Sequence, residues 1–270
     1  FVVLDRLGAD VRRALLIPVV CMQTIAANLG SMLTPIGNPQ NLYLYGKSGM
    51  SIGGFVLLML PYTLVSLLLL LAWAALVCRK TSAALSVDEL VSSSASQGDQ
   101  KIILLYLVLF AVCLLSVIRV LPYGIAFAAV LVCAFFADPR TLRTVDYSLL
   151  LTFVAFFIFI GNLGRIPAFS GWLQEFLTGR EVLVAVLASQ VTSNVPAALL
   201  LSGFTAETQA LIIGTNLGGL GTLIASMASL ISYRQIAREL PQGKKQYFGL
   251  FTLSNLIFLA ILLGVWYLLR

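Results

Sequence analysis

The sequence predicts an all-α polytopic membrane protein in which an inverted repeat contains broken helices and a re-entrant hairpin. Three observations support this fold class. The 270 residues are 60% hydrophobic and only 10% charged, with a mean hydropathy of +0.99. Long intervals without any charged residue follow one another along the chain, and two of these intervals resemble each other at a fixed spacing.

The composition excludes several classes of protein. Seventeen Lys and Arg and eleven Asp and Glu are too few to cover a soluble protein of this length, since an average globular chain is roughly one quarter charged. The chain has no His, which excludes a Ser-His-Asp triad, zinc held by His and haem held by His. Its basic residues stand singly or in pairs between apolar runs, so we expect no nucleic-acid partner despite the net charge of +6.

Eight charge-free intervals define the predicted elements, because a membrane-spanning helix needs about 20 mostly apolar residues. They are 14–46, 48–78, 102–118, 120–137, 147–164, 182–206, 208–233 and 246–269. Residues 79–101 form a polar, Ser-rich linker, and 138–146 and 234–245 are short charged connections. Residues 165–181 are amphipathic and include Trp172, so we expect a helix that lies in the membrane interface.

The interval 182–206 carries a polar run, from Ser189 to Asn194, directly before Pro196. It is either a Pro-kinked span or a re-entrant hairpin with its tip at 192–194. With a hairpin, 12 of the 17 Lys and Arg lie on one side of the membrane and 5 on the other, whereas a span gives 9 and 8. Basic residues gather on the cytoplasmic side, so the sequence favours the hairpin. The N-terminus of the chain is then cytoplasmic and the C-terminus extracellular or periplasmic.

Residues 28–45 and 216–233 form an internal repeat. At an offset of 188, seven of 18 positions are identical, including Asn28 with Asn216. Under the predicted topology the two copies cross the membrane in opposite directions. Inverted repeats of this kind are typical of secondary transporters.

Both copies are predicted to be broken helices. Residues 34–41 contain two Pro and a Gly, and residues 214–222 contain four Gly. Unwound backbone offers carbonyl oxygens to a cation, and the N-terminus of the resuming half-helix attracts an anion. Close packing of helices through small residues is the alternative explanation, especially for the Gly-rich copy.

These motifs resemble the ion transporter superfamily, which includes divalent anion–sodium symporters, citrate transporters and arsenite permeases. The resemblance rests on residues 26–30 and 34–39, on 193–196 and on 218–224. It implies an inverted-repeat transporter with paired hairpins and broken helices around a central anion site, an elevator motion and a homodimer. The substrate- and ion-binding residues it implies are Asn28, Gly30, Thr34, Pro35, Gly37, Asn38, Asn41, Thr192, Ser193, Asn194, Pro196, Thr215, Asn216, Gly218, Gly219, Gly221 and Thr222.

Two positions depart from branches of that superfamily. Val195 follows Asn194 where the sodium–dicarboxylate branch has Thr, and Asn38 stands where arsenite permeases and sodium/proton antiporters typically have Asp. The resemblance also implies an inner hairpin and scaffold helices before the first broken helix. We therefore expect the N-terminal part of the first repeat to be missing. Residues 1–78 are then the end of that repeat, with a broken helix at 14–45 and a span at 53–78, and residues 102–270 are the complete second repeat.

The sequence thus predicts a secondary active transporter of a small anion in the cell (inner or plasma) membrane, most simply a di- or tricarboxylate such as citrate or succinate. Arsenite or antimonite efflux and sodium/proton antiport are alternatives within the superfamily, and an intramembrane enzyme or a non-transporting subunit is the alternative of another class. The charge-free intervals offer no acid, base or metal cluster for catalysis. We expect no cofactor. The expected coupling ion is Na⁺, held at Ser193, Asn194, Gly218 and Gly219, with H⁺ as the alternative.

Overall fold

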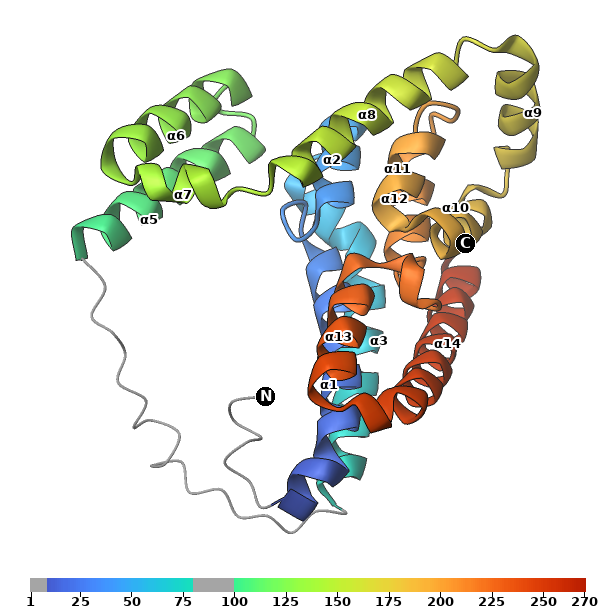
Figure 1. Cartoon of the computed structure of the whole chain (residues 1–270). Coiled ribbons are helices and arrows are strands. Elements are labelled where there is room, and N and C mark those ends of the chain that lie inside the picture. The colour runs from blue at the N-terminus through green and yellow to red at the C-terminus, as the bar shows by residue number, and fades with distance from the viewer. Residues whose placement is uncertain (1–8, 80–99) are drawn as a thin grey trace. The chain divides into compact units, whose positions relative to one another are not determined.

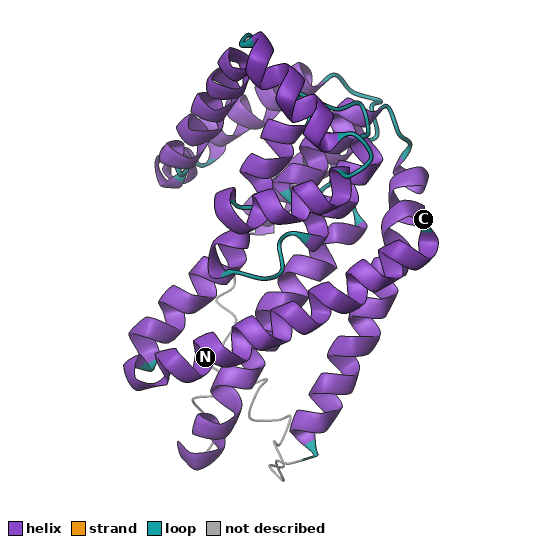
Figure 2. Ribbon diagram, turned by 90° about the vertical axis from the view of Figure 1, so that its right-hand side faces the viewer, coloured by secondary structure: helices purple, strands orange, loops and turns teal. Residues whose placement is uncertain are grey.

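The computed structural model describes residues 9–79 and 100–270, and these residues fold into helices without a β-strand (Figures 1 and 2). Most of the predicted linker at 79–101 lies outside the described residues. The chain divides into two compact units, one formed by residues 1–84 with 156–270 and the other by residues 85–155. Each unit is described by itself.

The α-helices are α1 (Ala9–Gly30), α2 (Pro39–Ser48), α3 (Ile52–Cys78), α5 (Gln100–Val117), α6 (Tyr123–Ala137), α7 (Pro139–Thr144), α8 (Tyr147–Leu163), α9 (Pro167–Leu177), α10 (Glu181–Thr192), α11 (Asn194–Leu201), α12 (Thr208–Leu217), α13 (Met227–Glu239) and α14 (Lys244–Leu269). Short 3₁₀ turns are η2 (Ser31–Leu33), η3 (Leu223–Ala225) and η4 (Pro241–Gly243).

Helices α1 and α2 flank the first helix break. Helix α2 resumes at Pro39, and the side chain of Asn38 caps it by accepting a hydrogen bond from the backbone N–H of Asn41 at 2.8 Å. Pro suits the first helical position because its missing N–H would have no partner there. Gly37 is required by a close approach, since a Cβ atom at this position would lie 1.8 Å from the carbonyl oxygen of Ser31.

Helices α12 and α13 flank the second break in the same way. Helix α13 resumes at Met227, 188 residues after Pro39, and Ser226 caps it through the backbone N–H of Ser229. The offset of the sequence repeat is therefore also the offset between the two resuming helices. The second break begins later in the chain than the positions of its Gly residues predicted. Helix α12 stays helical through residues 214–217 and ends only at the adjacent residues Gly218 and Gly219.

The helices α10 and α11 pack against each other around a break at Ser193, whose φ of 74° is unusual for a residue with a side chain. They contain 12 and 8 residues, or about 18 and about 12 Å of helix at 1.5 Å per residue. Each is much shorter than the roughly 30 Å hydrocarbon core of a bilayer. The break predicted at 192–194 is thus present at Ser193, between two helices that are each too short to cross a membrane alone.

Within residues 9–79 and 100–270, four helices are long and apolar enough to cross a membrane by themselves: α1 with η2, α3, α5 and α14 with η4. Helices α8 and α9 meet at an angle of 99°, so α8 and the predicted interfacial segment form a bent pair. Helix α6 has only 15 residues, which is short for the span predicted at 120–137. Large apolar side chains on these helices are exposed, among them Leu68, Leu107 and Phe127. The chain is an all-α polytopic membrane protein.

Two predicted connections are partly helical. Helix α13 continues to Glu239, well into the predicted connection 234–245, because Arg, Gln and Ala are good helix formers and the first residue that stops the helix is Pro241. The predicted connection 138–146 contains α7. There the Asp138 carboxylate accepts hydrogen bonds from the hydroxyls of Thr141 and Tyr106, which lower the pKa of Asp138.

The core of the larger unit forms where α1, α13 and α14 meet. Its fully buried aromatic side chains, Tyr247 and Phe251 of α14, pack against Ile17 and Cys21 of α1 and Ile236 of α13. These contacts fix α1 beside α13. The two helix breaks are positioned by that packing.

Candidate functional site

A pocket of about 230 Å³ lies where the two helix breaks and the turn at Ser193 meet, and we call it the central pocket. Its wall includes the first-turn residues of three helices and the last turn of α1. The lining residues are Ala27, Asn28, Ser31, Gly37, Asn38, Pro39, Gln40, Asn194, Val195, Ser226, Met227 and Ala228.

Three helix N-termini therefore point their first turns at one pocket. Pro39 and Gln40 begin α2, Asn194 and Val195 begin α11, and Met227 begins α13. The first N–H groups of a helix have no partner within the helix, and together with the helix dipole they place partial positive charge at the N-terminus. An anion in the central pocket would meet this charge from three directions, with no charged side chain among its described lining residues.

Asn28 and Asn216 hold the two breaks together. The Asn28 Oδ1 atom accepts a hydrogen bond of 2.7 Å from the hydroxyl of Ser226, and its Nδ2 atom lies 3.4 Å from the carbonyl oxygen of Gly219. The Asn216 Oδ1 atom accepts a 3.0 Å bond from Nδ2 of Asn38. Asn38 caps α2 and Ser226 caps α13. Asn28 and Asn216 therefore each bind the residue that caps the resuming helix of the other repeat copy.

Asn194 differs from these residues because its amide has no protein partner. The residue is 8% exposed, lines the central pocket and makes no side-chain hydrogen bond within residues 9–79 and 100–270. Its Nδ2 atom would lie 3.0 Å from a Cβ at Gly219, so the two residues are in close contact. The amide therefore remains available to a ligand in the pocket.

Gln190 of α10 fills the second break. Its Nε2 atom donates to the carbonyl oxygens of Gly218 and Leu220, each at 3.0 Å, and its Oε1 atom accepts from the backbone N–H of Thr222 at 2.9 Å. The sequence predicted that carbonyls at 218 and 219 would coordinate Na⁺. In the structure the Gly218 oxygen accepts from Gln190, and the Gly219 oxygen faces the Asn28 amide.

Asn41 plays the same role in the first break that Gln190 plays in the second. Its Nδ2 atom lies 3.3 Å from the carbonyl oxygens of both Met32 and Thr34, and its Oδ1 atom accepts a 2.6 Å hydrogen bond from Asn216. Both breaks are thus closed by a side-chain amide. The carbonyls of Met32 and Thr34 in the first break and of Gly218 and Leu220 in the second have partners within the protein.

The predicted site residues fall into three groups. Asn28, Gly37, Asn38 and Asn194 line the central pocket. A second group supports the lining residues from behind or adjoins them in the chain: Thr34, Pro35, Asn41, Ser193, Pro196, Asn216, Gly218, Gly219 and Gly221. The third group does not face the pocket: Gly30, Thr192, Thr215 and Thr222.

The contacts of the residues in the third group explain why they do not face the central pocket. Thr192 is exposed, and its hydroxyl donates back to the carbonyl of Ala188 in its own helix. Thr215 is buried and donates to Leu211 in the same manner. Thr222 binds the main chain of Gln190, and a Cβ at Gly30 would meet nothing within 4 Å. These hydroxyls satisfy helix carbonyls instead of facing a ligand.

Sequence reasoning missed four polar residues that the structure places in or beside the site: Ser31, Gln40, Gln190 and Ser226. Ser226 could have been found, because it stands 188 residues after Asn38, at the same place in the repeat. Gln190 belongs to the polar run that suggested the hairpin, but its role depends on the packing of α10 against the second break. In the described part of the chain no cluster of His, Cys, Asp or Glu suits a metal ion.

Comparison with known proteins places the chain in a family. A family model described as "Citrate transporter" matches residues 3–211. The chain is 34% identical over 223 residues to inner membrane protein YbiR of Escherichia coli, and 32% identical over 215 residues to an uncharacterized transporter of Methanocaldococcus jannaschii. Each match covers 80% of this chain and 57% of the relative, so the chain spans little more than half the length of these relatives. With most of its length matched by the family model, this chain belongs to the citrate transporter family.

Proposed function

We propose that the protein is a secondary active transporter that moves a small organic anion across the inner or plasma membrane, and that the anion is a di- or tricarboxylate such as citrate. The observation that carries this proposal is the convergence of three helix N-termini on the central pocket. A multiply charged anion gains from each of these termini. The unpartnered amide of Asn194 supplies a further donor.

Membership of the citrate transporter family and the similarity to an archaeal protein named as a transporter agree with transport. Catalysis is a weaker proposal, because the described lining of the central pocket holds no acid, base or metal cluster. Arsenite or antimonite efflux is the second candidate. Efflux of these solutes would need a site of the same size for an anion or a neutral oxyacid. The three positive helix ends around one pocket favour a carboxylate substrate.

The proposed motion is of the elevator type, in which the hairpin and both breaks move as one body. Several contacts support this. Gln190 ties α10 to the second break, and Asn216 ties the second break to the first. At the far end of the hairpin, Ser202 contacts the Tyr43 hydroxyl and accepts a hydrogen bond from the Lys47 ammonium through its carbonyl oxygen. We propose a homodimer as the frame against which this body moves.

We propose Na⁺ as the coupling ion, with H⁺ as the alternative. Among the described lining residues none titrates near neutral pH, so the pocket offers no group of its own to carry a proton. Since the carbonyls of Gly218 and Met32 already accept hydrogen bonds from amides, a sodium ion would bind at the hairpin tip, where the Asn194 Oδ1 atom and the carboxylate of the substrate supply oxygens.

Uptake of radiolabelled citrate, succinate and arsenite into vesicles that contain the full-length protein tests this proposal. We expect saturable citrate or succinate uptake that depends on a Na⁺ gradient. Uptake unchanged when choline replaces Na⁺, but abolished by a protonophore, would select H⁺. A folded protein that moves none of these solutes would refute the transport function.

A further inference from the structure

Gln40, the second residue of α2, lines the central pocket and is only 3% exposed. Its side-chain amide makes no hydrogen bond within residues 9–79 and 100–270. Its main-chain N–H has no partner there either. In the same turn, Asn38 accepts hydrogen bonds from the N–H groups of Asn41 and Leu42, and Pro39 has no N–H. Gln40 therefore offers the pocket a main-chain N–H, the donor Nε2 and the acceptor Oε1.

The side of the central pocket at Gln40 is built from elements that this chain contains. Helix α2 packs against α11 and α12. One turn beyond Gln40, the Tyr43 hydroxyl lies 3.0 Å from the hydroxyl of Ser202 at the end of α11. Since 3% of Gln40 is exposed, almost none of its surface is left for a further part of the full-length protein to cover.

The other polar side chains of the described pocket lining are occupied, apart from Asn194. Four of them already form hydrogen bonds within the protein: Asn28, Ser31, Asn38 and Ser226. The Asn194 Oδ1 atom is the ligand that we propose for Na⁺. The Gln40 Oε1 atom is then the side-chain acceptor that remains for the substrate.

The chemistry of this acceptor limits what can bind it. A carboxylate only accepts hydrogen bonds, so it can use Nε2 of Gln40 but not Oε1. The three positive helix ends favour an ionised carboxyl group, so a protonated carboxyl is not the donor. A substrate hydroxyl can donate to Oε1. Since Nε2 and Oε1 stand side by side on one amide, a hydroxyl next to a carboxylate matches both.

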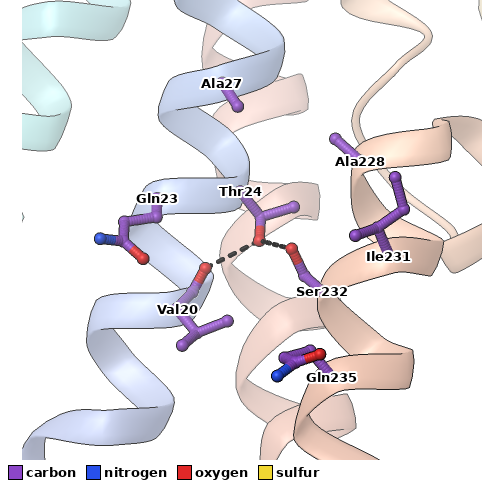
Figure 3. Close-up of a pocket in the computed structure, with 8 residues that line it drawn as sticks. All are labelled: Val20, Gln23, Thr24, Ala27, Ala228, Ile231, Ser232 and Gln235. Atoms are coloured by element: carbon purple, nitrogen blue, oxygen red, sulfur yellow. Dashed lines mark hydrogen bonds between the residues drawn. The ribbon is translucent and has the colours of Figure 1, made fainter. Parts of the chain in front are cut away.

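Position 40 also breaks the symmetry of the two repeat copies. Its counterpart, 188 residues later, is Ala228, the second residue of α13. Ala228 lines the same pocket but carries only a methyl group (Figure 3). The first turns of both helices offer main-chain N–H groups to a carboxylate, whereas the side-chain amide stands on one side only. This arrangement suits a substrate with carboxylates at both ends and a hydroxyl near one of them.

We propose that Gln40 selects substrates that carry a hydroxyl beside a carboxylate, so that the substrate class is the 2-hydroxy di- and tricarboxylates, such as malate and citrate. This inference rests on the proposed transport of a di- or tricarboxylate. A site that pairs a polar group with a substrate hydroxyl rejects the analogue without it, because the polar group then loses its partner.

Uptake of matched solutes into vesicles that contain the full-length protein tests this proposal. Succinate lacks only the hydroxyl of malate, and tricarballylate lacks only the hydroxyl of citrate. We expect half-saturating concentrations about tenfold lower for the hydroxylated member of each pair. Gln40→Met removes the amide and keeps the length of the side chain. It should lose this preference by weakening malate and citrate, with succinate and tricarballylate nearly unchanged.

Two further variants separate selection from general anion binding. Gln174→Met, at an exposed position on α9, is the matched control and should keep the wild-type preference. Asn194→Ala should weaken both members of each pair by similar factors.

Equal half-saturating concentrations within both pairs for the wild-type protein would overturn the selection of a hydroxyl, whether or not any variant folds. A folded Gln40→Met protein with the wild-type preference would overturn the assignment to Gln40. Uptake of none of the four solutes by the folded wild-type protein would instead refute the transport function on which this inference rests.

Discussion

Asn28 and Asn216 occupy equivalent positions in the two helix breaks, and each binds the residue that caps the opposite copy. Asn28 accepts from the hydroxyl of Ser226 at 2.7 Å, and Asn216 accepts from the amide of Asn38 at 3.0 Å. This exchange brings the N-termini of α2 and α13 to one pocket. The repeat relates these two contacts to each other. The site therefore has an approximate twofold symmetry, as the repeated sequence predicts.

Replacement of these two residues by Ala should have different effects. Asn28 lines the pocket and is half-buried, so Asn28→Ala should lose uptake and keep its folded yield. Asn216 is 2% exposed and also binds Asn41, so Asn216→Ala leaves buried amides unpaired and should lose about 1–3 kcal/mol of stability for each. Thermal stability in detergent and citrate uptake measure the two effects. Asn162→Ala, at an exposed position on α8, is the control, and equal losses of stability in both Asn variants would contradict this assignment.

The hairpin tip should contribute through Asn194 and not through Thr192. Asn194→Ala removes the unpartnered amide and should raise both the citrate and the Na⁺ concentrations needed for half-maximal uptake. Thr192→Ala changes a hydroxyl that binds its own helix and should leave both values near those of the wild-type protein. Concentration series of uptake at fixed pH measure this pair. A larger effect at Thr192 than at Asn194 would place the ligand on the other side of the tip.

Gly221 and Gln190 should be coupled in stability. Gly221 has a φ of 111°, and a Cβ atom there would lie 2.3 Å from Oε1 of Gln190. Gly221→Ala should therefore lose stability through both backbone strain, of order 1–3 kcal/mol, and this clash. In the double variant Gly221→Ala with Gln190→Ala the clash is absent. The loss of stability of the double variant should therefore be smaller than the sum of the losses of the two single variants.

Thermal unfolding in detergent measures this cycle. Gly249→Ala is the matched control, since Gly249 lies within α14 and a Cβ there meets nothing within 4 Å. Additive losses at positions 190 and 221 would show that the two residues do not interact in the folded protein.

The predicted topology requires labelling on opposite sides of the membrane. Cys introduced at Ser96, which lies outside the described residues, and at Gln242 in η4 should react from the cytoplasmic side, and Cys at Thr178 after α9 should react from the other side. The reason is that α10 and α11 together turn back and do not add a crossing. Reaction of the variants at Ser96 and Gln242 from opposite sides would show that residues 182–206 span the membrane.

Much of the architecture could be predicted from local sequence. Pro35, Gly37 and Pro39 cannot continue a helix, so the first break was predictable. The break at Ser193 was predictable from the polar run before Pro196. The limits of the second break were less predictable. Gly214 stays helical because its missing side chain allows α10 to approach closely, since a Cβ would lie 2.7 Å from the Cβ of Ala185.

The composition of the site depended on tertiary contacts that no local pattern contains. Gln190 is one polar residue among several in the hairpin, and only the packing of α10 against the second break brings its amide to the carbonyls of Gly218 and Leu220. Thr192 and Thr215 have the residue type of a ligand, but a Thr on a helix readily donates to a carbonyl of the preceding turn. Residue type and motif position therefore predicted the region of the site more reliably than its individual ligands.

The central claim is that the central pocket binds a carboxylate anion, and isothermal titration of citrate into the purified full-length protein at constant Na⁺ tests it most directly. The account predicts saturable binding that is weakened by Asn194→Ala, while Thr192→Ala binds like the wild-type protein. Citrate binding that is unaffected by Asn194→Ala and by Asn28→Ala, in variants that remain folded, would contradict the assignment of the anion to this pocket.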